Sequence, residues 1–197
     1  MSRLTKRVWA NNKSPLLTEY TKIQVYRACV QSTLLYGSES LALRARQERK
    51  LNANHVCCLR HILELTWQDK VTNNSVLGRA RITSIYTMLK QRRMRWLGQV
   101  MRMGRIHKDL PKYGELMQGK RPIGIKLRYK DECKRDLKAM DVDLATWETL
   151  AADRSAWRQY VQKGLFEFEE SLAKQSEAMR QRRKANSQED IPESDFV

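Results

Sequence analysis

The stretch LKQRRMRWLGQVMRM (Leu89–Met103) combines an apolar stripe with a dense row of cations. Ser84 is a suitable N-cap residue just before it. The apolar residues recur at the three- and four-residue intervals of an amphipathic helix: Ile85, Met88 or Leu89, Trp96, Val100 and Met103. We therefore expect a central helix with Lys90, Arg92, Arg93, Arg95 and Arg102 around its apolar stripe. Gly98 inside a helix costs about 1 kcal/mol relative to alanine, so we expect a neighbouring element to pack closely against it.

A second basic cluster, QGKRPIGIKLRYK (Gln118–Lys130), follows on a Gly/Pro turn. From Arg79 to Lys138 there are 18 Lys and Arg against 5 Asp and Glu, so this segment contributes +13 of the net charge of +16. A charge of this size and clustering favours a polyanionic partner, and nucleic acid is the leading candidate. An anionic membrane surface and a ribosome-like or simply soluble basic protein are the alternatives.

Helical spacing continues on both sides of the central segment. Upstream it predicts a helix capped by Thr18 and ending near Gly37, then helices over residues 47–65 and 75–80. Downstream it predicts helices over residues 127–140, from Asp143 or Thr146, and from Asp153. No stretch alternates long enough to argue for a sheet. The predicted fold is all-α: an irregular bundle of about six to eight helices with a Gly/Pro-containing basic loop and a disordered acidic C-terminal tail. Residues 1–165 would form a helical basic domain, and residues 166–197 a charged helix fraying into that tail.

The cysteines and tryptophans favour a reduced, packed interior. Cys57 and Cys58 are adjacent and have no regular spacing to Cys29 or Cys133, which argues against a disulfide framework and for buried thiols. His55 and His61 flank the pair, but a structural zinc site needs two spaced ligand pairs, so we expect no metal. The larger aromatic side chains are expected in the core: Trp67, Trp147 and Trp157.

No apolar run reaches the length of a membrane span, and no signal peptide is evident, which suggests a nuclear or cytoplasmic protein.

The sequence contains no recognisable catalytic constellation. Gly119-Lys120-Arg121 lacks both the upstream glycine and the Ser/Thr of a phosphate loop. Asp141 and Asp143 are more simply explained as helix caps than as metal ligands. We therefore expect no enzymatic activity and no cofactor.

Nucleic-acid contact is the function that the charge pattern favours. Arginines at the edges of the central helix can follow a phosphate track, and the Gly119–Gly124 turn can bring more cations to the same strand. The candidate contacts are Arg92, Arg93, Arg95, Arg102, Lys120, Arg121, Lys126, Arg128 and Lys130.

Three groups of segments, in order, also carry a family resemblance: VYRACVQSTLLYGSES (Val25–Ser40), LRHILELTWQDKVTN (Leu59–Asn73), and RRMRWLGQVMRM with PKYGELMQGKRPIG and RYKDECKRDLK after it. The chain resembles the C-terminal region of the reverse transcriptase polyprotein of non-LTR (LINE-type) retrotransposons, from about Ser2 to Gly164. WETLAADRSAWRQYV is similar to the closing Trp-containing segment of that family.

The resemblance implies a helical thumb and post-thumb region that grips primer–template, with the catalytic aspartates of the palm upstream and no matching pair here. The family usually shows tryptophan where Leu41 stands, glycine at Glu64 and histidine at Gln99. The leading hypothesis is a non-catalytic remnant or fragment that binds RNA or RNA–DNA hybrid, with DNA also possible. The alternative is a domesticated protein-interaction factor that uses its Trp-containing helices and acidic tail. A third possibility is an open reading frame without a stable product.

Overall fold

The computed structural model describes residues 18–103 and 129–189, and all regular secondary structure in these ranges is helical. The first helical run is continuous, and counting it as one helix gives seven in the described ranges, which confirms the all-α prediction. The elements are α2 (Glu19–Val25), the π-helix η2 (Tyr26–Gln31), α3 (Ser32–Leu34), α4 (Ala45–Ile62), α5 (Asn73–Ala80), α6 (Ile85–Arg102), α8 (Tyr129–Ala139), α9 (Trp147–Ala152) and α10 (Arg154–Glu189). None of the described helices is both long enough and apolar enough to span a membrane.

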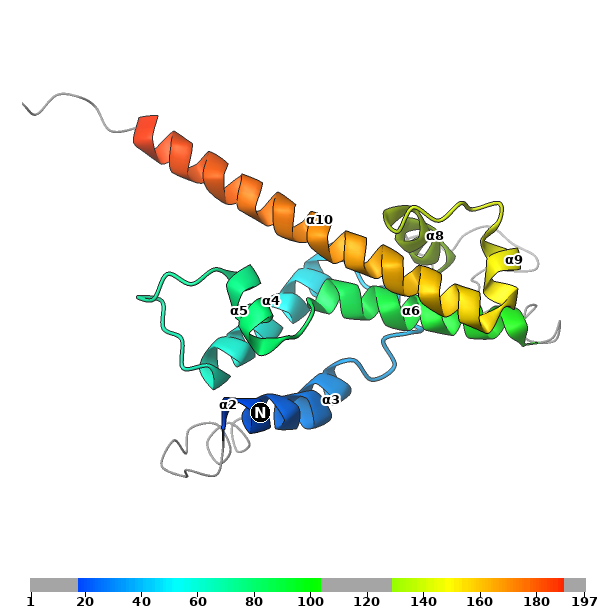
Figure 1. Cartoon of the computed structure of the whole chain (residues 1–197), viewed down its shortest axis with the longest axis horizontal. Coiled ribbons are helices and arrows are strands. Elements are labelled where there is room, and N and C mark those ends of the chain that lie inside the picture. Colours follow the sequence, from blue (N-terminus) through cyan, green and yellow to red (C-terminus); the bar gives the residue numbers. More distant parts are fainter. Residues whose placement is uncertain (1–17, 104–128, 190–197) are drawn as a thin grey trace, which may run out of the picture.

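Helix α6 is the central element of the molecule, because its two halves belong to two different hydrophobic cores. Ile85, Met88 and Leu89 pack with the first helical run, α4 and α5. Met94 and Leu97 pack with α8, α9 and the first half of α10. Figure 1 shows α6 between α10 and the α2–α3 run.

Gly98 lies where α6 crosses α10. A Cβ atom built on Gly98 would lie 2.3 Å from Nε1 of Trp157, so only glycine allows this approach. The same indole nitrogen donates a hydrogen bond to the Met94 carbonyl at 2.9 Å. The expected close packing at Gly98 is therefore confirmed.

Helix α10 runs along α6 and then extends past α5 (Figure 1). Glu169 of α10 accepts hydrogen bonds from the Ser84 backbone N–H at 2.9 Å and from the Ser84 hydroxyl at 2.7 Å, at the start of α6. The helix continues without a break across residues 165 and 166, and its residues 174–186 are mostly exposed. The predicted acidic tail after Glu189 and the predicted Gly/Pro basic loop lie outside the described residues.

Helix boundaries follow local capping chemistry. The predicted caps Thr18 and Ser84 are confirmed, since their side chains accept hydrogen bonds from the Thr21 and Thr87 N–H groups. Gly37, with φ +68°, follows the first helical run as predicted. The ends of α4, α5 and α8 lie instead at non-glycine residues in the left-handed conformation: Glu64, Arg81 and Asp141.

Two expectations about the interior were wrong. Trp67, on the turn after α4, is 84% exposed because the described helices leave its indole largely uncovered. Trp157 is buried as expected, and Trp147 is half-buried against it. Cys29 and Cys57 are exposed and only Cys133 is buried, although all four thiols are free. Burial raises the pKa of Cys133 to about 12, which keeps its thiol protonated.

A buried histidine joins the first helical run to α4. His55 is fully buried, and its Nδ1 lies 2.6 Å from the hydroxyl of Tyr26. Burial lowers the pKa of His55 to about 4, so the ring is neutral at physiological pH. In the described part of the chain, no three His, Cys, Asp or Glu side chains group as metal ligands would.

Candidate nucleic-acid interface

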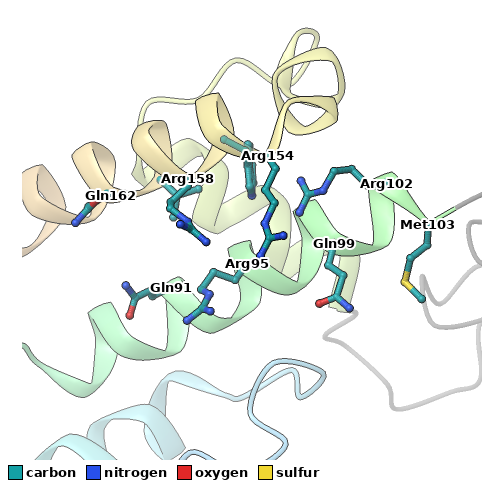
Figure 2. A pocket seen from close by; sticks show the side chains of 10 residues that line it. Gln91, Arg95, Gln99, Arg102, Met103, Arg154, Arg158 and Gln162 are labelled. Atoms are coloured by element: carbon teal, nitrogen blue, oxygen red, sulfur yellow. The ribbon is translucent and has the colours of Figure 1, made fainter.

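A groove of about 640 Å³ runs between α6 and the first turns of α10. We call it the α6–α10 groove, and Figure 2 shows its side chains. Its lining residues are Gln91, Arg95, Gln99, Arg102, Met103, Arg154, Trp157, Arg158, Val161 and Gln162.

Helical spacing brings the polar residues of the groove together. Arg95, Gln99 and Arg102 recur at intervals of four and three residues, which places them on one face of α6. Arg154, Arg158 and Gln162 recur every four residues on α10. The contact at Gly98 and Trp157 holds the two helices close, and Figure 2 shows that the side chains of both helices reach into the space between them.

The lining of the groove is strongly cationic, with four arginines and no acidic residue. Arg102 donates from Nη1 to the Ala151 carbonyl at 2.7 Å, which fixes its side chain at the end of the groove. Arg95, Arg154 and Arg158 make no ion pair or side-chain hydrogen bond within the described residues. Their guanidinium groups are available to pair with phosphate oxygens, which they match in bidentate geometry.

The basic surface extends along α6 towards the first helical run. A hollow beside the groove shares Gln91, Arg95 and Gln99 with it and adds Arg92, and a further hollow adds Arg27 and Arg81. Arg92 is half-buried: its Nη1 donates to the Leu35 carbonyl at 3.0 Å and lies 3.9 Å from a Glu39 oxygen. From Gln91 to Arg102 the helix rises about 16 Å, which is long enough to contact several successive phosphates.

Arg93 is a wrong assignment in the predicted contact set. Its side chain is 1% exposed, and its Nε lies 2.6 Å from Oδ2 of Asp136 in α8. Its guanidinium also lies 3.5 Å from a Glu48 oxygen in α4. The buried face of α6 includes Arg93, Met94 and Leu97, whereas Trp96 is only half-buried. The predicted apolar stripe is therefore rotated about the helix axis from the face that is actually buried.

The remaining predicted contacts are distributed unevenly. Arg95 and Arg102 line the groove, and Arg92 lies next to it. Lys130 lies in the first turn of α8 and does not line the groove. Four others lie outside the described residues: Lys120, Arg121, Lys126 and Arg128.

Arg154 and Arg158 were missed by sequence reasoning because residues 139–197 carry a net negative charge, with 8 Lys and Arg against 12 Asp and Glu. The four-residue spacing of Arg154, Arg158 and Gln162 was the signal that could have identified this face.

Comparisons with family models, with curated proteins and with solved structures found no match to this chain. What the groove can bind is therefore inferred from its own chemistry.

Proposed function

We propose that this chain binds RNA or an RNA–DNA primer–template through the α6–α10 groove, without catalysing a reaction itself. The observation that supports this most directly is a groove with four arginines and no acidic side chain, in which three of the arginines have no partner among the described residues.

The chemistry of the groove suits a sugar–phosphate backbone. Clustered guanidinium groups bind phosphates and release condensed counterions, so the affinity should fall steeply as salt rises. Gln91, Gln99 and Gln162 add amide donors and acceptors between the arginines, which suit phosphate oxygens and ribose hydroxyls.

The resemblance to the post-palm region of non-LTR retrotransposon reverse transcriptases supports the same proposal. In that context the chain is a thumb-like, non-catalytic remnant or fragment, and the chemistry belongs to a palm that this sequence does not include. Gln99, where the family usually shows histidine, lines the groove, so this position faces the proposed ligand.

The alternative role, protein docking through the Trp-containing helices, has less support. Trp157 is buried, and Trp147 packs against it with ring centroids 6.4 Å apart. Trp157 is therefore enclosed by the core, and Trp147 is only partly exposed.

The test is the salt dependence of binding to an RNA–DNA hybrid. Arg95→Gln with Arg158→Gln removes two groove cations that have no described partner. The slope of log K against log salt should become shallower by about 1.5 to 2, because each phosphate contact contributes about 0.9. A duplex DNA arm and an RNA arm measure the preference among nucleic acids.

Arg46→Gln with Lys50→Gln is the matched control. It removes the same charge from exposed positions of α4 that line neither the groove nor the hollows beside it. Equal slopes for the two double variants would show that the groove is not the binding site. Binding by the unaltered protein that does not depend on salt would overturn the proposal as a whole.

A further inference from the structure

A second groove lies near the other end of α10, beside the exposed indole of Trp67. Its volume is about 600 Å³. We call it the Trp67 groove, and its lining residues are Arg60, Leu65, Thr66, Trp67, Lys70, Val71, Thr72, Asn73, Asn74, Ser176, Glu177, Arg180 and Arg183.

Trp67 is presented by an ordered turn. Oδ2 of Asp69 accepts hydrogen bonds from the Thr66 backbone N–H at 2.6 Å and from the Thr66 hydroxyl at 2.9 Å. The backbone bond and then the hydroxyl bond lower the pKa of Asp69, so its carboxylate holds the turn across the neutral range. The Lys70 N–H closes the turn on the Trp67 carbonyl at 3.3 Å. The backbone at Trp67 is therefore held in a defined turn, while 84% of the residue surface stays exposed.

Four cations line the same groove as this indole. The groove is lined by Arg60, Lys70, Arg180 and Arg183 against a single acidic residue, Glu177, which lies 3.7 Å from Arg180. Arg60 donates to the Val71 carbonyl at 2.6 Å and to the Asn73 side chain at 3.0 Å, which braces the wall of the groove.

The opposite wall is fixed as well, because Asn74 at the start of α5 donates to the Ser176 hydroxyl of α10 at 2.7 Å. The Trp67 groove thus has two walls joined by side-chain hydrogen bonds, an exposed aromatic ring at its edge and an excess of positive charge. This combination of a stacking surface with cations is the chemistry that recognises single-stranded nucleic acid.

We propose that the Trp67 groove binds single-stranded RNA or DNA, with one unpaired base stacked on the Trp67 indole and neighbouring phosphates paired with the surrounding cations. The inference rests on the proposed nucleic-acid function and deepens it by adding a separate single-strand site. Bases within a duplex are already stacked on each other, so the exposed indole discriminates in favour of unpaired ones. Arg158 and Arg180 are about 33 Å apart along α10, so the two grooves lie on one continuous helix and can engage different parts of one nucleic acid.

The experiment compares two single-stranded probes of equal length, an oligouridine and an abasic oligonucleotide with the same number of phosphates. Trp67→Ala should weaken oligouridine binding by about fivefold or more, because a base stacked on an aromatic ring contributes roughly 1–3 kcal/mol. Affinity for the abasic probe should stay unchanged, since it offers phosphates without bases. Trp67→Phe should retain part of the lost affinity.

Phe166→Ala is the matched control, because Phe166 is an exposed aromatic residue of α10 that lines neither groove. Unchanged oligouridine binding by Trp67→Ala would overturn the inference and leave Trp67 as a candidate protein contact. An equal loss on both probes would also overturn it, because the effect would then not depend on a base.

The two proposals fail separately. If Arg95→Gln with Arg158→Gln changes the salt slope on hybrid while Trp67→Ala changes nothing, only the single-strand site is wrong. If Trp67→Ala weakens oligouridine binding while the double arginine variant has the same salt slope as its control, the single-strand site is supported and the α6–α10 groove is not the hybrid-binding site. Thermal unfolding of each variant, monitored by circular dichroism, verifies that the proteins compared are folded.

Discussion

At Gly98 the side chain is a hydrogen atom because the indole of Trp157 occupies the space that a methyl group would need. Glycine destabilises a helix interior. At this position it allows α6 and α10 to cross at short range, and the α6–α10 groove lies beside the crossing. A local rule of helix propensity is thus overridden by packing, which is common where two helices approach closely.

The paired substitutions Gly98→Ala and Gly78→Ala test this reading. Gly98→Ala should lower the free energy of unfolding by about 1–3 kcal/mol, because the methyl group forces the Trp157 indole aside. Gly78→Ala in α5 meets open space and should raise it by up to about 1 kcal/mol. Urea unfolding of both variants measures the two values, and a stabilised Gly98→Ala protein would refute the close crossing.

Arg93 shows the limit of reasoning from residue type alone. An arginine in a run of arginines is normally solvated, yet this one is buried against Asp136. It is therefore a structural residue, and replacing it tests stability rather than binding. Substitutions meant to probe nucleic-acid contact belong at Arg95 and Arg158.

At the scale of elements, three helices end in the same backbone motif without the glycine that usually accompanies it. After α8, the Asp141 N–H bonds to the Lys138 carbonyl and the Val142 N–H to the Leu137 carbonyl, with Asp141 at φ +55°. The ends of α4 and α5 repeat this arrangement at Glu64 and Arg81. Glycine would relieve the strain of the left-handed backbone at each of these three positions.

Asp141→Gly should therefore stabilise the protein by about 0.5–1 kcal/mol relative to Asp141→Ala. Both variants lose the same carboxylate, and they differ only in the Cβ atom that the left-handed conformation disfavours. The hydrogen bond that Tyr160 donates to the Asp141 carbonyl is retained in both. Equal melting temperatures for the two variants would contradict the strain at this helix end.

At the scale of the whole molecule, a buried ionic network joins the two hydrophobic cores. Asp136 of α8 is fully buried and pairs with both Lys90 and Arg93 of α6, at the point where one core ends and the other begins. Glu48 of α4 extends the network to a third helix. Lys90 also lies 4.6 Å from the ring centroid of Phe168 in α10, so four helices meet at this point.

Asp136→Asn should destabilise the protein by about 3–5 kcal/mol, because it leaves two buried cations without their carboxylate. Asp131→Asn, at an exposed position in the first turn of the same helix, is the control and should change stability by no more than about 1 kcal/mol. Calorimetric unfolding distinguishes the two. A small effect at Asp136 would show that the cores are joined by apolar contacts alone.

Much of the fold could be predicted from residue order because helices depend on local signals. Apolar spacing predicted the all-α class, Thr18 and Ser84 predicted where helices begin, and Gly98 predicted a close crossing. The same signals were insufficient where a helix end lacks glycine, as at Glu64, Arg81 and Asp141, since only the backbone conformation marks those ends.

The sequence alone therefore determined the helical class, the main caps and the concentration of charge on the central helix, because each depends on residues a few positions apart. Which arginines face the groove was decided by tertiary structure: Asp136 draws Arg93 inwards from 43 residues away, while Arg154 and Arg158 of α10 are brought opposite Arg95 and Arg102. The exposure of Trp67 was likewise a tertiary outcome, because the described helices leave its indole largely uncovered. Local spacing fixes which face a residue shares with its neighbours, but only the packing of distant helices decides whether that face meets protein or solvent.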